Sequence, residues 1–171
     1  AERKDIWRVK YNNGNWGKPE YLAAINTDNQ EAYPTLTHEG TLYFTSDRSG
    51  GKGSMDIYNS KNVKRKFAMP RPVGELNSID TENDVFVDSK ERFIILNRYL
   101  LQTKEIELFI SYNENGIWSD PQPLLSVNQK GKWELTPTIS PDGDYLLYEV
   151  GGKIRYIRMN DLLKNTKYQS P

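Results

Sequence analysis

Three carboxylates recur along the chain at nearly constant spacing: Glu31, Glu82 and Glu134. Carboxylates repeated around the mouth of a channel can bind a cation or a sugar. The alternative is that each carboxylate accepts hydrogen bonds from backbone N–H groups of its own loop. We favour this structural alternative, because true binding sites usually break the symmetry of a repeat.

Two arginines and one tryptophan are further candidate ligand-binding residues at the same channel mouth. Arg48 follows Asp47, and Arg98 follows an asparagine, so that each pair offers a cation. A guanidinium can hold a carboxylate or a phosphate through two parallel hydrogen bonds. A salt bridge between neighbouring sheets is the slightly favoured alternative. Trp133 breaks the repeat just before Glu134, which makes it the aromatic candidate for stacking on a sugar or peptide, with simple packing as the alternative.

An alternating acidic run, Asp80, Glu82 and Asp84, has the spacing of oxygen ligands on a calcium-binding loop. The run lacks the glycine and the helix–loop–helix setting of an EF-hand. We therefore expect no cofactor and treat calcium as a weak alternative. His38 is the only histidine, and the chain has no cysteine. A Ser–His–Asp triad or a multi-histidine metal site within the chain is thus implausible.

These candidates belong to a repeat of about 51 residues. An acidic–aliphatic–aromatic triplet recurs at residues 5–7, 56–58 and 107–109. Other positions recur in all three copies, namely Trp16, Phe67 and Trp118; Pro19, Pro70 and Pro121; and Asn26, Asn77 and Asn128. An aromatic residue, a proline and an asparagine that recur together indicate a repeat architecture.

Each period contains four β-branched or aromatic segments separated by turn residues. The expected strands are residues 32–37, 41–46, 55–60 and 71–73; then 85–87, 92–96, 106–112 and 122–124; then 136–139, 145–150 and 153–158. A short helix is expected over residues 159–167. Four antiparallel strands in about 50 residues predict an all-β fold of β-propeller blades.

The copies do not begin in phase. Residues 5–22 are expected to be the outer two strands of a blade, 23–73 and 74–124 whole blades, 125–158 a terminal partial blade, and 159–171 the helix and tail. Three and a half blades cannot close a ring. We expect the missing blades to come from the same chain or from a second copy. Trp7, Trp16 and Trp118 are expected to pack between blades.

The composition narrows the possible partners. Lys plus Arg and Asp plus Glu both number 23, so the net charge is zero and gives no electrostatic case for binding nucleic acid. No apolar stretch reaches the roughly 18 residues that would span a membrane.

The first copy resembles the TolB-like (WD-repeat-like) propeller family. The resemblance rests on Trp16, Pro19, Ile25, Asn26, Thr27, Glu31, Pro34, Gly40, Leu42, Tyr43, Phe44, Ser46, Asp47, Arg48, Asp56, Ile57 and Tyr58, with the turn Ser140, Pro141, Asp142 and Gly143 in the third copy. The second copy departs from the pattern, since Val85 replaces Pro34. The resemblance implies a bacterial propeller, usually periplasmic or on the cell surface, that is typically six-bladed.

The expected function is a non-catalytic, ligand- or protein-binding propeller of the bacterial cell envelope, with a protein, peptide or glycan at the channel mouth. A carbohydrate-active enzyme, either a glycoside hydrolase or a lyase, is the alternative, because glycosidases need only two suitably separated carboxylates. Glu31, Asp47, Asp84 and Glu134 would supply them. A third alternative is the propeller of a larger peptidase.

Overall fold

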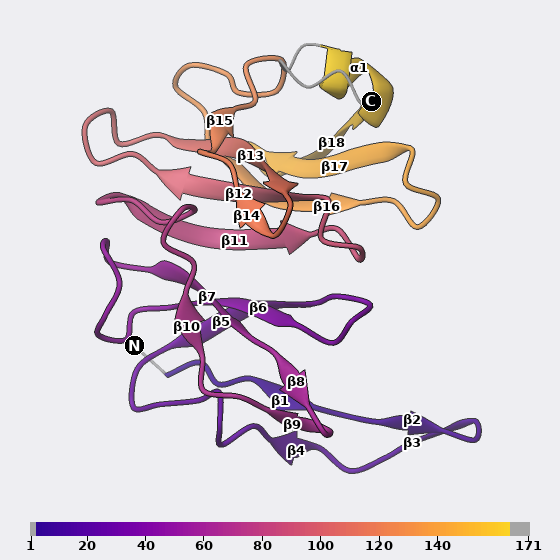
Figure 1. Cartoon of the computed structure of the whole chain (residues 1–171). Coiled ribbons are helices and arrows are strands. Elements are labelled where there is room, and N and C mark those ends of the chain that lie inside the picture. Colours follow the sequence, from indigo (N-terminus) through magenta and orange to yellow (C-terminus); the bar gives the residue numbers. More distant parts are fainter. Residues whose placement is uncertain (1–2, 165–171) are drawn as a thin grey trace.

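The protein is all-β apart from one short helix in the part that the structure, a computed structural model, describes (residues 3–164) (Figure 1). The chain begins with an N-terminal pair of antiparallel strands, β1 (Trp7–Arg8) and β4 (Glu20–Tyr21). A hairpin of β2 (Tyr11–Asn12) and β3 (Asn15–Trp16) connects them.

Three antiparallel sheets follow in chain order. The first sheet contains β5 (Glu31–Leu36), β6 (Leu42–Ser46), β7 (Asp56–Ser60) and β10 (Arg71–Pro72), with the hairpin β8 (Asn62–Val63) and β9 (Lys66–Phe67) between its last two strands. The second sheet contains β11 (Thr81–Val87), β12 (Phe93–Tyr99), β13 (Ile106–Glu114) and β15 (Gln122–Pro123), and β14 (Ile117–Trp118) pairs with the end of β13. The third sheet contains β16 (Glu134–Ile139), β17 (Tyr145–Val150) and β18 (Lys153–Arg158), followed by helix α1 (Met159–Lys164).

The sheets stack in sequence order, with the N-terminal pair β1 and β4 and helix α1 at opposite ends of the stack (Figure 1). Three apolar clusters form the core, one between each successive pair of layers. Neighbouring side chains on β6 point to different clusters, because successive residues of a strand face opposite sides of the sheet. Tyr43 packs toward the second sheet, whereas Phe44 packs with Ile6 and Leu22 toward the N-terminal pair. This two-sided burial explains why the central strands are apolar throughout.

The first strand of each sheet departs from a regular ladder at the same place. Pairing shifts between Ala32 and Thr35 in β5, and at the equivalent points of β11 and β16. Tyr33 and Thr136 adopt left-handed backbone conformations there, with φ of 51° and 48°. Such bulges re-aim the side chains at one edge of a sheet. They were not predicted from the sequence.

One sequence expectation is corrected. Trp118 is buried and meets Tyr43 edge to face, but Trp7 and Trp16 are 57% and 73% exposed and do not pack between sheets. Helix α1 covers residues 159–164 of the expected helix, and residues 165–167 lie outside the described part. Among residues 3–164, no helix has the length and apolar character needed to cross a bilayer.

Candidate functional site

The repeated asparagines bind the backbone of the preceding outer strand. Asn77 accepts a hydrogen bond from the Ile57 N–H (2.7 Å) and donates one to the Ile57 carbonyl (3.0 Å). Asn26 makes the same pair of bonds with Ile6, at 2.8 and 2.9 Å. Asn128 does so with Leu108, at 2.9 and 3.0 Å. A side-chain amide carries one donor and one acceptor side by side, so it can satisfy a strand residue as a neighbouring strand would. The asparagine is therefore a structural part of the repeat.

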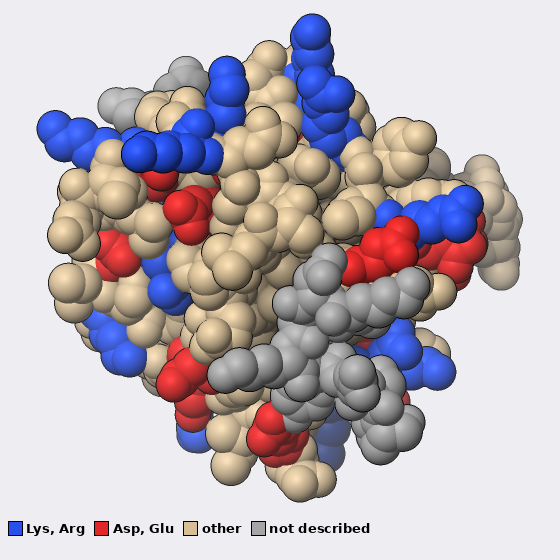
Figure 2. Space-filling view, turned by 90° about the horizontal axis from the view of Figure 1, so that it is seen from above, with Lys and Arg blue, Asp and Glu red and all other residues tan. Residues whose placement is uncertain are grey.

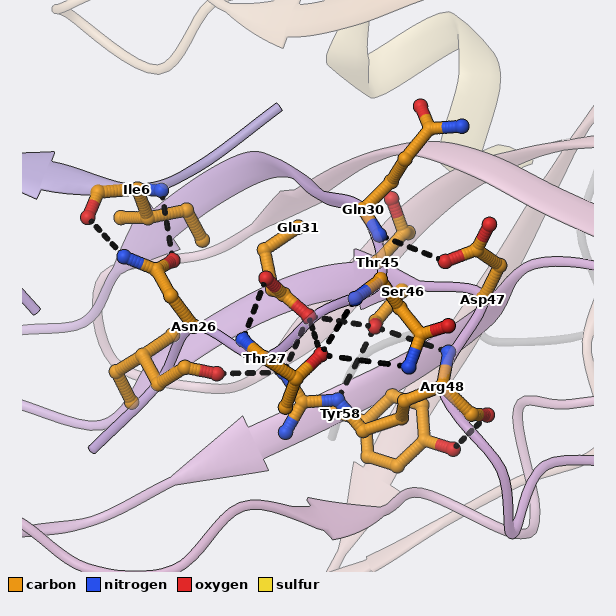
Figure 3. A network of polar contacts seen from close by, with 12 residues as sticks. Ile6, Asn26, Thr27, Gln30, Glu31, Thr45, Ser46, Asp47, Arg48 and Tyr58 are labelled. Atoms are coloured by element: carbon orange, nitrogen blue, oxygen red, sulfur yellow. Dashed lines mark hydrogen bonds and ion pairs between the residues drawn. The ribbon is translucent and has the colours of Figure 1, made fainter. Parts of the chain in front are cut away.

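Glu31 lies buried beneath the loop that follows Asn26 (Figure 3). Its carboxylate accepts hydrogen bonds from the Thr27 N–H (3.0 Å), the Thr27 hydroxyl (2.7 Å) and the Ser46 hydroxyl (3.1 Å). It also pairs with the Arg48 guanidinium at 2.9 Å. The side chain is thus fully engaged, but only one of its donors is a backbone N–H, whereas the structural alternative expected backbone N–H groups of the loop.

Arg48 is held on three sides. It donates to the Ile25 carbonyl at 2.6 Å, and its guanidinium lies about 5 Å from the ring centres of Phe44 and Tyr58. Only 12% of its side chain is exposed. Its ion pair with Glu31 joins β5 to the loop after β6 in the same sheet, so the expected bridge between neighbouring sheets is wrong.

The second sheet repeats this arrangement with small changes. Glu82 accepts from the Ser78 hydroxyl and from the Arg98 guanidinium, both at 2.7 Å. Arg98 also donates to the Leu76 carbonyl (3.0 Å) and lies 4.7 Å from the Phe109 ring centre. Burial raises the pKa of Glu82, and the Ser78 hydroxyl and the Arg98 charge oppose that shift. In both sheets an arginine of the chain itself fills the position beside the glutamate.

The third sheet keeps the glutamate but not its partners. Glu134 is 0% exposed, yet one carboxylate oxygen accepts only a 3.3 Å hydrogen bond from the Gln129 N–H. Its Oε2 atom is buried without a hydrogen-bond partner among the described residues. Burial raises the pKa of Glu134; the Gln129 N–H opposes the shift, and the Glu107 and Glu105 carboxylates increase it.

Asp84 lies elsewhere, at the bulge of β11, and joins two sheets. Its Oδ2 accepts from the Thr136 N–H (2.7 Å) and from the Asn97 side chain (2.9 Å). Burial raises the pKa of Asp84 despite these hydrogen bonds, and burial and the Asp84 charge raise the pKa of Tyr33. An open, mainly apolar groove of about 540 Å³ lies here, lined by Tyr33, Pro34, Asp84, Thr136, Pro137 and Ile154.

The acidic run does not converge on one point. Asp80 accepts a hydrogen bond from the Leu101 N–H at 2.9 Å, while Glu82 and Asp84 serve the separate networks above. Within residues 3–164, no three His, Cys, Asp or Glu side chains come together in a way that could hold a metal ion. The geometry therefore gives no support for calcium at this run.

Asp47 and Trp133 lie at the loop surface. Asp47 is exposed and accepts a hydrogen bond from the Gln30 N–H at 2.7 Å, which ties two loops together (Figure 3). Trp133 is 53% exposed, and its indole N–H donates to the Lys104 carbonyl at 3.2 Å. Of the predicted candidates, only Trp133 and Glu134 are adjacent and not fully used by the fold.

Two structural roles escaped the sequence reasoning. Asp56 is buried and accepts hydrogen bonds from the N–H groups of Lys52 and Gly53, so the glycine-rich loop is folded around a carboxylate. A Cβ at Gly51 would collide with that carboxylate. The second role is that of the hydroxyl residues Thr27 and Ser78, which donate hydrogen bonds to Glu31 and Glu82. Each lies four positions before its glutamate, and this spacing was a visible signal in the sequence.

Together these features define a protein of repeated, stacked antiparallel sheets. The same internal polar network recurs in its first two sheets and is incomplete in its third. In comparisons with known proteins, no family model and no curated protein matches the chain.

Proposed function

We propose that the stacked sheets are blades of a β-propeller of the TolB-like kind. Each sheet runs in chain order from its first strand outward, and the first strands lie side by side, β5 next to β11 and β11 next to β16. The Glu82 N–H donates to the Met55 carbonyl of the sheet before it, just as the Glu31 N–H donates to the Lys4 carbonyl. Identical links between successive layers are what radial stacking of a repeat requires.

The same proposal assigns the protein a non-catalytic binding function in the bacterial cell envelope, in the periplasm or at the cell surface. The location rests on the sequence resemblance alone. The observation that carries the binding function is the groove along the first strands, where the exposed residues Tyr33 and Thr136 add polar groups to mainly apolar walls. Ligand sites have this composition.

An enzymatic role is less well supported by the carboxylates it would need. Glu31 is buried in an ion pair, and Asp84 is held by the Thr136 N–H and the Asn97 amide. A general acid or base must be able to reach the substrate. These two side chains instead serve the fold.

The groove assignment can be tested with arrays of peptides and glycans probed with the whole protein. We expect saturable binding to one class, and loss of that binding in Thr136→Arg, which places a long charged side chain in the groove. The matched control is Thr103→Arg, at an exposed threonine outside the groove. Equal binding by both variants, or no ligand on either array, would contradict the proposal.

A further inference from the structure

The three repeated glutamates have successively fewer hydrogen-bond and ion-pair partners along the chain. Glu31 has four hydrogen-bond or ion-pair contacts, from Thr27, Ser46 and Arg48. Glu82 retains the hydroxyl and guanidinium contacts. Glu134 retains one long contact with a backbone N–H, and its Oε2 atom has none within residues 3–164. A buried, unpartnered carboxylate is costly unless something neutralises it.

The missing partner in the third sheet is an arginine. In the second sheet the residue that pairs with Glu82 across the ladder is Arg98, whose guanidinium neutralises the carboxylate. In the third sheet the residue that pairs with Glu134 is Val150, which has no polar atoms. The chain then turns through Gly151 and Gly152, so no side chain from this turn replaces the guanidinium.

The other elements of the arginine site are still present. Arg48 and Arg98 donate to the carbonyls of Ile25 and Leu76, which lie in equivalent turns. Val127 lies in the corresponding turn of the third copy, since its N–H bonds three residues back as theirs do. The third copy therefore has the backbone carbonyl, that of Val127, which would accept a hydrogen bond from a guanidinium.

The surroundings of Glu134 favour a cation. Glu107 and Glu105 are half-buried, and both lie close enough to act electrostatically on Glu134. Guanidinium groups combine well with carboxylates.

We propose that Glu134, with the Val127 carbonyl and Glu107, forms a binding site for an arginine side chain of a peptide or protein ligand. The ligand arginine takes the place that Arg48 and Arg98 occupy in the first two sheets. The site breaks the symmetry of the repeat, as a functional site is expected to do. This inference adds a second binding site, separate from the groove, and goes beyond the proposed function.

The test is a titration of the isotope-labelled whole protein with N-acetyl-L-arginine amide, followed by NMR at the backbone amides of Gln129 and Glu134. Saturable shifts are expected with the arginine probe. The neutral citrulline analogue and the lysine analogue serve as ligand controls and are expected to bind more weakly. Equal binding of citrulline would show that charge is not recognised, and equal binding of lysine would show that the guanidinium is not; either result overturns the proposal.

Glu134→Gln is expected to weaken arginine binding about 10- to 100-fold, the range for loss of one charged hydrogen-bonded pair. The control Glu39→Gln removes an exposed carboxylate in a distant turn and is expected to leave binding unchanged. Unaltered binding by Glu134→Gln overturns the site.

A second variant supplies the arginine from within the chain. Val150→Arg places it opposite Glu134, as Arg98 stands opposite Glu82. We expect a folded Val150→Arg protein to lose binding of the free probe, and normal probe binding by that protein would refute the proposal. If the variant fails to fold, Glu134→Gln still decides. Ligand binding in the groove that is sensitive to Thr136→Arg, without arginine binding, would remove this inference and leave the proposed function standing.

Discussion

Removal of one repeated asparagine offers a direct test of how the sheets are held together. Asn77→Ala deletes both hydrogen bonds to Ile57 and leaves the buried Ile57 N–H without a partner, whereas the Ile57 carbonyl still accepts a hydrogen bond from the Val73 N–H at 2.9 Å. A buried group left unsatisfied costs about 1–3 kcal/mol, and the loss of the second hydrogen bond costs about 1 kcal/mol. We therefore expect the free energy of unfolding to fall by about 2–4 kcal/mol. For a chain of this length, that corresponds to a drop in Tm of about 4–16 °C.

The assay is urea denaturation followed by tryptophan fluorescence, with the slope m compared between variants to show that unfolding stays cooperative. Asn12→Ala, at an exposed hairpin position, is the control and should change stability by less than about 0.5 kcal/mol. Asn26→Ala should behave like Asn77→Ala, because its two bonds to Ile6 are the same. A loss at Asn77 no larger than that of the control would refute the reasoning.

Three further predictions concern the charged network and the tight turn. Arg98→Met leaves its carboxylate partner buried and should cost about 3–5 kcal/mol, whereas Arg92→Met, whose ion-paired side chain is 68% exposed, should cost less than about 1 kcal/mol; urea unfolding of both variants measures the difference. Because the folded-state pKa of Glu134 is raised, ionisation of this carboxyl destabilises the fold as pH rises. Glu134→Gln should therefore be more stable than the wild type at pH 7 and lose that advantage below about pH 4, which urea titrations at both pH values measure. Gly53→Ala should lower stability by about 1–3 kcal/mol because its Cβ would meet a backbone carbonyl, and Gly74→Ala, which meets no atom within 4 Å, should be nearly neutral by thermal melts.

Much of the strand pattern could be predicted, because its signals are local. The β-branched and aromatic segment at residues 41–46 is β6, and the segment at residues 153–158 is β18. The recurrence of Asn26, Asn77 and Asn128 also indicated a shared role, although the sequence alone did not say which backbone groups they bind. The antiparallel, all-β character of the chain followed from these repeated short segments.

The candidate site was harder to predict because its contacts depend on register. A constant shift of 51 residues aligns Asp47 with Arg98, yet the guanidiniums of Arg48 and Arg98 both reach a repeated glutamate. The bulge that places Tyr33 in a left-handed conformation has no local signature, since tyrosine rarely adopts it. Burial of Glu134 without a partner is a property of packing, which only the arrangement of the sheets reveals.

The surface charge agrees with a neutral chain. Seen from the end of the stack that carries the third sheet, Lys and Arg side chains and Asp and Glu side chains both lie mainly around the edge, and neither sign forms one dominant patch (Figure 2). A face of this kind gives little long-range attraction to polyanions. Recognition by this protein is therefore expected to depend on individual groups, such as Glu134.

The different exposures of the three hairpin aromatics follow from the stacking order and not from different roles. Phe67 packs against the core between the N-terminal pair and its own sheet, and Trp118 reaches Tyr43 of the sheet before it. Trp16 has the same hairpin position in the N-terminal pair, which no other described sheet precedes, and its ring meets that of Tyr11 on the same hairpin. A sheet stabilised by its neighbours exposes apolar surface wherever a neighbour is absent. Equivalence in a stacked repeat must therefore be judged by position in the hairpin, because solvent exposure also reports where in the stack the sheet lies.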